Sequence, residues 1–349
     1  MAEEFGVKPF TQEQIERLSF LPKSSIALLH CHRGFDTVTF DKPTYVYTGR
    51  GPSTASFHIG HLPGLQLCLN LQKHLAEPIV FMIADDEKMF RDGIDRSVME
   101  ENVRETIQQL RRIGFNADNT RFRINSDGFT AEEYGLLIQM LRIVSVNTLT
   151  QIFGAKPNIG EYLYPLIQIL PCFSKGRQCV VVAGIDQDPF FRLARDISRR
   201  LGFTPPAVLY TRSVPGLDGS EKMSTSVSSS IPIFLTDSDD DIRVKVKRIS
   251  VVGAGSLDEL FERGADLTKD IPYRLIELFD PDSTNRTLLA RAYTVGLTED
   301  SDIAIVTALV PPKGIHQREV RTMLTSHGIR CYLTELLIRE IKAITNKEC

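Results

Sequence analysis

The chain of 349 residues contains no tryptophan, and its six cysteines form no Cys-x-x-Cys pair. Without such a pair the sequence indicates neither a common zinc site nor a redox-active dithiol. The apolar runs, such as residues 180–183, are far too short to span a bilayer. The acidic start, Met-Ala-Glu-Glu, has neither an apolar signal core nor an arginine-rich presequence. We therefore expect a cytoplasmic protein that has no membrane partner and holds no metal with its own side chains.

Two common phosphate-binding loops are also missing. No Gly-Lys-Ser/Thr occurs anywhere, which excludes a P-loop, and Gly49-x-Gly51 lacks the third glycine of the dinucleotide fingerprint. The net charge of −3 means that any contact with RNA must depend on local basic patches rather than on the overall field.

The stretch from Tyr45 to His61 lies where a strand and a helix are predicted to meet. Residues 44–47 are β-branched and aromatic, which favours a strand, and we expect Gly49 and Gly51 to end it because glycine adopts positive φ. A leucine-rich helix is predicted over residues 62–75. A turn of this kind, at the carboxyl end of a parallel strand, is where α/β folds bind nucleotides.

Two histidines, His58 and His61, lie in this turn with Gly60 between them. Residues three apart in the first turn of a helix share one face. Imidazoles on that face can donate hydrogen bonds to phosphate oxygens beside the positive end of the helix. Taken alone, the pattern fits two surface histidines near a turn equally well.

The distribution of apolar segments predicts an α/β protein of two domains. The continuous apolar run 78–84 and the segment 178–184 are typical of buried parallel strands, and the chain is too long for one small core. We predict an N-terminal segment over 1–40, a Rossmann-like parallel-sheet domain that binds nucleotide over 41–236, and an α-helical domain over 237–349.

The pattern over residues 93–158 predicts a helix, a short strand and a second helix. A capping box at Ser97-x-x-Glu100 predicts a helix to about residue 113, and a second helix is predicted over 134–149. The later helices are predicted over residues 272–279, 302–309, 315–326 and 332–345.

A hydroxyl-rich loop with one lysine, Lys222-Met-Ser-Thr-Ser226, lies far downstream of the histidine pair. Together with His58-Ile-Gly-His61 it resembles the two signatures of class I aminoacyl-tRNA synthetases. Three further motifs, Tyr47-Thr-Gly-Arg-Gly-Pro-Ser53, Asp85-Asp-Glu-Lys88 and Gly184-Ile-Asp-Gln-Asp-Pro189, are similar to those of tryptophanyl-tRNA synthetases of the eukaryotic and archaeal type. The resemblance extends from about residue 25 to residue 250.

The resemblance implies that tryptophan is activated by ATP and then transferred to tRNA(Trp), with Mg²⁺ held mainly by phosphate oxygens. It also implies a homodimer whose interface is the insert at 93–158, and a C-terminal domain that reads the anticodon. The basic run from Arg243 to Arg248 is a candidate contact to that RNA.

The same resemblance assigns a role to individual residues. It assigns catalysis to His58, His61, Lys222 and Ser224. It assigns ATP binding to Arg50, Gly51, Ser53, Gly60, Gly184, Asp186 and Met223. It assigns tryptophan binding to Tyr47, Gly49, Glu87, Gln168 and Gln187.

The choice between tryptophan and tyrosine depends on a few polar residues. The sister tyrosyl-tRNA synthetases carry an aspartate three residues after the buried glutamine. Here Gln168 is followed at that spacing by Pro171, whose side chain cannot form a hydrogen bond with the phenol of tyrosine. Tyr47 can accept a hydrogen bond from the indole N–H, which is only a donor. Many members of the family carry glutamine where this chain has Met82, so the N–H contact differs here.

Three alternatives remain open at this point. A tyrosyl-tRNA synthetase shares the fold, and small nucleotidyltransferases also use a His-x-Gly-His turn, although they are usually shorter and lack a large helical domain. A non-catalytic, synthetase-like RNA-binding protein would be expected to show decayed signatures, and both signatures are intact here.

Overall fold

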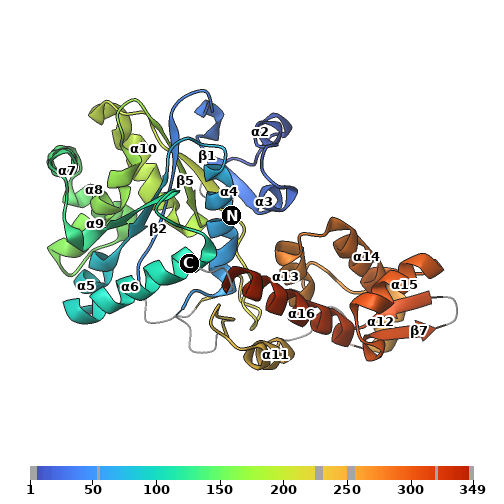
Figure 1. The fold of residues 1–349 in the computed structure, drawn as a ribbon. Coiled ribbons are helices and arrows are strands. Elements are labelled where there is room, and N and C mark those ends of the chain that lie inside the picture. The colour runs from blue at the N-terminus through green and yellow to red at the C-terminus, as the bar shows by residue number, and fades with distance from the viewer. Residues whose placement is uncertain (1–5, 53–55, 225–230, 250–255, 319–320, 346–349) are drawn as a thin grey trace. The chain divides into compact units, whose positions relative to one another are not determined.

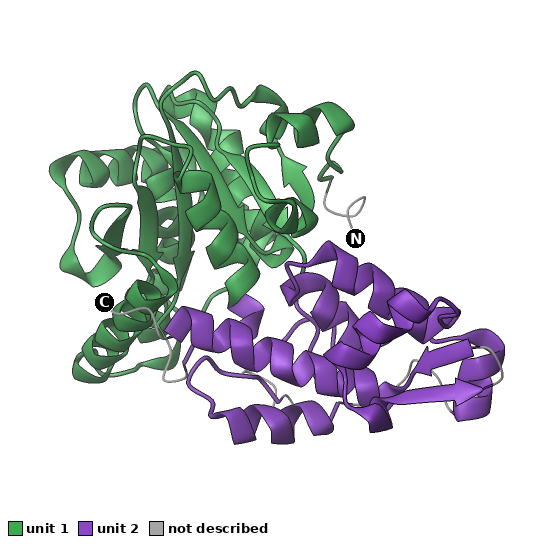
Figure 2. Cartoon of the chain, turned by 45° about the vertical axis from the view of Figure 1, so that its right-hand side comes forward, with its two compact units in different colours: residues 1–55, 62–212, 349 green, residues 56–61, 213–348 purple. Residues whose placement is uncertain are grey.

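The computed structural model describes residues 6–52, 56–224, 231–249, 256–318 and 321–345. The chain forms two compact units, coloured separately in Figure 2. Unit 1 comprises residues 1–55, 62–212 and 349, and unit 2 comprises 56–61 and 213–348. The chain therefore leaves unit 1 after residue 212, whereas the sequence predicted a domain boundary after residue 236. The turn that carries the histidine pair groups with unit 2.

Unit 1 is built on a six-stranded sheet with the order β1-β6-β5-β2-β3-β4. All neighbouring strands are parallel except β1, which pairs with β6 in the antiparallel sense. The predicted α/β class with its parallel sheet is thereby confirmed. The strands are β1 (Leu29–Arg33), β2 (Thr44–Arg50), β3 (Ile79–Ile83), β4 (Thr120–Ile124), β5 (Gln178–Ala183) and β6 (Ala207–Thr211).

Helices surround this sheet (Figure 1). Thr11 is the N-cap of α2, since its hydroxyl accepts a hydrogen bond from the Gln14 N–H while the Gln14 side chain accepts one from the Thr11 N–H. The leucine-rich segment is the helix α4, which packs on β2, β3 and β5. The helices of unit 1 are α2 (Gln12–Arg17), α3 (Lys23–Ala27), α4 (Leu62–Gln72), α5 (Asp85–Asp92), α6 (Arg96–Ile113), α7 (Ala131–Ile143), α8 (Val146–Phe153), α9 (Ile159–Ile169) and α10 (Asp188–Leu201).

Unit 2 is mainly helical in its described residues. Its helices are α11 (Asp239–Lys247), α12 (Leu257–Arg263), α13 (Ile271–Phe279), α14 (Ser283–Thr294), α15 (Asp300–Leu309) and α16 (Ser326–Thr345), and β7 (Ile315–Arg318) and β8 (Arg321–Leu324) form an antiparallel hairpin. The predicted helix over 315–326 is therefore wrong. β8 acquires a second backbone partner, because Thr322 and Leu297 exchange hydrogen bonds at 2.9 Å in both directions.

Two further helix predictions need correction. The Ser97-x-x-Glu100 capping box does not form, because α6 begins after Asp95 and Glu100 instead accepts a hydrogen bond from Arg96 at 3.0 Å. The helix predicted over 134–149 is two helices, α7 and α8, separated by a bend of 88°. Ser145 starts α8 by accepting a hydrogen bond from the Thr148 N–H.

Of the two glycines predicted to end the strand after Tyr47, Gly51 directly follows the end of β2, whereas Gly49 does not end the strand. Gly49 lies inside β2, opposite Met82 of β3, and positive φ is found at neither Gly49 nor Gly51. A Cβ on Gly49 would lie 2.9 Å from the Met82 Cβ, so glycine is needed there for close packing of the strands.

Within the described ranges, no single helix has both the length and the apolar character needed to cross a bilayer. The bent pair α7 and α8 passes that test only when the two helices are taken together, and only by length and composition.

Candidate active site

The histidine pair is positioned by a short antiparallel pairing inside unit 2. The Leu235 N–H donates to the Phe57 carbonyl at 2.8 Å, and the Ile59 N–H donates to the Ile233 carbonyl at 2.9 Å. Between these bonds His58 forms a bridge with Phe234. The turn that precedes α4 is therefore held by a segment far along the chain.

The two imidazoles lie on the same face, as their spacing predicted, with ring centroids 3.8 Å apart and ring planes tilted by 40°. The supporting turn is a 3₁₀ helix, η2 (Ile59–His61), rather than the first turn of an α-helix. The His58 N–H donates to His61 Nδ1 at 3.3 Å. A Cβ on Gly60 would lie 2.7 Å from His58 Nδ1, so this position requires glycine.

The lysine signature lies in the same unit as the histidine pair. The Met223 N–H donates to the Val214 carbonyl at 2.7 Å, and the Met223 side chain is buried. Lys222 is exposed and Ser224 is half-buried. A Cβ on Gly60 would lie 3.3 Å from the Met223 Cβ, so the two signatures meet at this point. The rest of the signature, residues 225 and 226, lies outside the described residues.

A chain of amide hydrogen bonds joins three predicted site residues of unit 1. Gln168 Nε2 on α9 donates to Gln187 Oε1 at 2.9 Å, and Gln187 Nε2 donates to Asp186 Oδ2 at 3.1 Å. Asp186 and Gln187 belong to η5 (Ile185–Gln187), a 3₁₀ turn that follows β5 and for which Gly184 is the N-cap. A buried glutamine side chain needs a hydrogen-bond partner, and Gln168 finds it in Gln187, another residue of the predicted site.

Tyr47 is fully buried beneath this chain of amides. Its hydroxyl donates to the Gln168 carbonyl at 2.5 Å and lies 3.4 Å from Met82 Sδ. Burial raises the pKa of Tyr47 well above its usual value, so the phenol stays protonated.

The acidic motif after β3 starts the helix α5, and its first two carboxylates are structural. Asp85 accepts the Ser126 N–H at 3.1 Å, and Asp86 accepts from Asn125 Nδ2 at 2.8 Å. Both aspartates are buried, whereas Glu87 is only half-buried. Burial raises the pKa of Glu87, although the charge on Arg91 opposes this shift. A Cβ on Gly51 would lie 3.4 Å from Glu87 Oε2.

The remaining predicted residues follow β2. Arg50 ends this strand and is half-buried, and burial lowers the pKa of its guanidinium to about 10, so it keeps its charge at neutral pH. Ser53 lies outside the described residues.

Comparison with known proteins decides the family. Residues 39–295 match the family described as class I tRNA synthetases, W and Y. The cytoplasmic tryptophan–tRNA ligase of Schizosaccharomyces pombe is 33% identical over 318 residues, which covers 84% of this chain and 80% of that protein. The tryptophan–tRNA ligase of Encephalitozoon cuniculi is 30% identical over 352 residues, or 95% of this chain and 91% of that protein.

This chain belongs to the class I tRNA synthetases of the W and Y type. Two solved structures agree with this assignment. The tryptophanyl-tRNA synthetase from Giardia lamblia superposes with a TM-score of 0.83 at 26% identity, over 100% of this chain and 93% of that one. The Encephalitozoon cuniculi enzyme bound to tryptophan gives a TM-score of 0.80 at 26% identity, over 99% and 92%.

One polar cluster of this synthetase was missed by the sequence reasoning. Asp188 follows Gln187 directly and is fully buried, and its carboxylate accepts hydrogen bonds from Arg33 Nε at 2.6 Å, from Arg33 Nη2 at 2.9 Å and from the Tyr210 hydroxyl. Burial lowers the pKa of Arg33, but the hydrogen bond and charge of Asp188 outweigh this and raise it. The second aspartate of Gly184-Ile-Asp-Gln-Asp-Pro189 was the available signal.

Proposed function

We propose that this synthetase is a tryptophan–tRNA ligase. It activates tryptophan with ATP to tryptophanyl-adenylate, releases pyrophosphate, and then transfers tryptophan to tRNA(Trp). The observation that carries the proposal is the meeting of the two signatures at Gly60 and Met223, each with its chemistry-bearing residues intact. The names of the relatives from Schizosaccharomyces pombe and Encephalitozoon cuniculi support tryptophan as the amino acid.

The first reaction needs aligned reactants and stabilised charge rather than a protein nucleophile. The tryptophan carboxylate attacks the α-phosphorus of ATP and expels pyrophosphate. His58 and His61 donate to the phosphate oxygens on which negative charge develops. The exposed ammonium of Lys222, with the Ser224 hydroxyl, stabilises the departing pyrophosphate.

The amino acid is held by the polar residues of unit 1. The hydroxyl of Tyr47 uses its proton on the Gln168 carbonyl, so its oxygen lone pairs are left to accept the indole N–H. Glu87 attracts the substrate ammonium, and the amides of Gln168 and Gln187 orient the substrate's polar end. Pro171 offers no side-chain partner to a phenol, which disfavours tyrosine.

The nucleotide is bound by the residues that follow β2 and β5. We assign the adenosine and phosphate path to Arg50, Gly51 and Ser53 and the ribose to Gly184 and Asp186. Among the described residues, no group of three histidine, cysteine or acidic side chains is placed to hold a metal. Phosphate oxygens are the ligands that Mg²⁺ prefers, so the ATP phosphates would supply most of its coordination, and bound Mg²⁺ would neutralise their charge.

A direct test is ATP–pyrophosphate exchange with each of the twenty amino acids. We expect tryptophan alone to support exchange, and only when Mg²⁺ is present. Because the chain contains no tryptophan, binding of the free amino acid can be followed by its own fluorescence. Exchange with tyrosine but not with tryptophan would overturn the amino-acid assignment.

The partners follow from the same proposal. An apolar stripe on α7, formed by Tyr134, Ile138 and Leu141, is exposed and lies in the insert expected to join two copies. We propose a cytoplasmic homodimer through this stripe, with unit 2 reading the anticodon. Sedimentation of an Ile138→Asp variant should show monomers, whereas an unchanged dimer would exclude this surface.

A further inference from the structure

We propose that Lys245 is a positioning residue for His58, acting through Asp237 and Phe234. This inference rests on the catalytic role proposed for His58. It also gives Lys245 a different task from the RNA contact that the basic run 243–248 suggested. All four residues belong to unit 2.

The contacts that link Lys245 to His58 begin with an ion pair at one carboxylate oxygen of Asp237. Lys245 Nζ on α11 donates to Asp237 Oδ2 at 2.6 Å, and the same oxygen accepts the Phe234 N–H at 2.8 Å. The two charged side chains are 21% and 11% exposed, so water screens this pair less than a surface pair. The lysine thus fixes the carboxylate that holds the backbone of Phe234.

The ammonium also lies against the aromatic ring. Lys245 Nζ is 4.8 Å from the centroid of the Phe234 ring, within the range of a cation–π contact. Removing this lysine would therefore weaken the contacts that hold both the backbone and the side chain of Phe234.

The second step is the contact between Phe234 and His58. These residues face each other in the antiparallel pairing that holds the histidine turn, and their ring centroids are 6.5 Å apart at 66°. A pairing of only two short segments is marginal unless the residues around it are packed. The Lys245–Asp237 pair supplies that support at the residue opposite His58.

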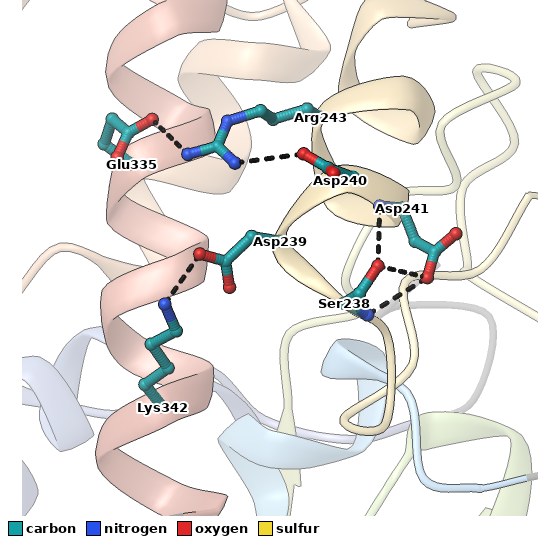
Figure 3. A network of polar contacts seen from close by, with 7 residues as sticks. All are labelled: Ser238, Asp239, Asp240, Asp241, Arg243, Glu335 and Lys342. Carbon is teal, nitrogen blue, oxygen red and sulfur yellow. Dashed lines mark hydrogen bonds and ion pairs between the residues drawn. The ribbon is translucent and has the colours of Figure 1, made fainter.

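The helix that carries Lys245 is itself anchored (Figure 3). Ser238 caps α11 by accepting the Asp241 N–H, and Lys342 of α16 donates to Asp239 at 2.6 Å. Arg243 reaches both Asp240 of α11 and Glu335 of α16 at 3.4 Å. Although such surface pairs contribute little singly, together they set the position of α11 on α16.

The test is Lys245→Met, measured by tryptophan-dependent pyrophosphate exchange. We expect kcat to fall roughly 10–100-fold, because a small displacement of an aligned group has that effect. Tryptophan binding, followed by fluorescence, should stay unchanged, since the residues proposed to hold it belong to unit 1. Lys245→Arg should restore most of the activity because it keeps the charge beside Asp237 and Phe234.

The matched control is Lys269→Met, which removes another lysine–aspartate pair of unit 2 that is 69% and 41% exposed. It should leave exchange unchanged, and thermal unfolding should show that both variants fold. Lys245→Met should also lose its effect when His58→Ala is already present, because residues that act together are not additive. Fully additive losses would overturn the proposal, and so would a Lys245→Met variant that loses only tRNA charging.

A spectroscopic measurement separates this inference from the proposed function. The chain has seven histidines, so the imidazole signals can be assigned by substitution. Lys245→Met should shift the NMR signals of His58, and Lys269→Met should not, whichever amino acid the enzyme activates. If wild-type protein fails to exchange with tryptophan while His58 still shifts, the proposed function fails and the positioning stands. An unshifted His58 refutes the positioning.

Discussion

The buried ion pair between Arg33 and Asp188 offers the sharpest test of how the turn η5, which carries Asp186 and Gln187, is held in place. Arg33 comes from β1 near the N-terminus, and Asp188 is the first residue of α10, directly after Gln187. Replacing Arg33 by methionine keeps an unbranched side chain of similar bulk at the edge strand and removes only the guanidinium. The Asp188 carboxylate, with 1% of its side chain exposed, then loses two of its hydrogen bonds.

The expected loss of unfolding free energy in Arg33→Met follows from the burial of Asp188. Leaving a buried charge without its partner typically costs about 3–5 kcal/mol of unfolding free energy. The Tyr210 hydroxyl still donates to Asp188, which favours the lower end of that range. The matched control is Arg96→Met, whose partner is Glu100 and whose pair is 71% and 54% exposed. A surface pair of this kind contributes about 0–1 kcal/mol.

The assay is urea unfolding followed by circular dichroism, with hydrogen exchange to locate the effect. Peptides from β1 and β6 of unit 1 should lose protection in Arg33→Met, while α16 of unit 2 should keep it. The double variant Arg33→Met/Asp188→Asn should recover part of the loss, because no charged carboxylate is then buried.

Two results would contradict this reasoning. The first is an Arg33→Met variant no less stable than Arg96→Met. The second is a double variant whose loss equals the sum of the two single losses. Because Asp188 follows Gln187, we also expect Arg33→Met to raise the KM for tryptophan in pyrophosphate exchange.

The other predictions concern the reaction itself. Lys222→Ala should slow exchange roughly 10–1000-fold with little change in tryptophan binding, since a contact to departing charge strengthens in the transition state; wild-type exchange would exclude this lysine from catalysis. Glu87 has a raised pKa through burial, so tryptophan binding should weaken as the pH falls toward about 4.5, before an ordinary glutamate would be protonated. Fluorescence titration should show this dependence in wild-type protein and not in Glu87→Gln, and a pH-independent wild type would contradict the assignment. Gly60→Ala should lower kcat, because its new Cβ would lie 2.7 Å from His58 Nδ1. Wild-type exchange in Gly60→Ala would contradict this prediction, because it would show that the histidine turn can shift without loss of activity.

Local patterns were sufficient for the strands β2, β3 and β5 and for the residue types of the two signatures. Residues 179–183 are all apolar and include three consecutive valines, and such a run predicts a buried parallel strand wherever it lies in a fold. The helix after His61 followed from its leucines, and the position of His58 and His61 on one face followed from their spacing of three. The two signatures contain in consecutive residues the groups that the reaction needs, so their types and order could be read directly.

Predictions failed where a distant partner decides the local structure. Residues 315–326 form a hairpin rather than a helix, and Thr322 of that hairpin exchanges backbone hydrogen bonds with Leu297. Ser97 does not cap α6 because the helix starts at Arg96, whose side chain pairs with Glu100. Propensity is a weak prior in such cases, because tertiary contacts outweigh the few tenths of a kcal/mol that separate ordinary residues.

The sequence by itself determined the chemical groups of this synthetase, because its motifs are continuous in the chain. Only the tertiary structure decided which segments hold those groups in place. Arg33 and Asp188 are 155 residues apart, and the segment 57–59 pairs with 233–235, so no local pattern predicts either contact. A buried charge needs a partner and a short strand needs a neighbour, but many residues could satisfy either need. The fold decides which residue is brought close enough to do so.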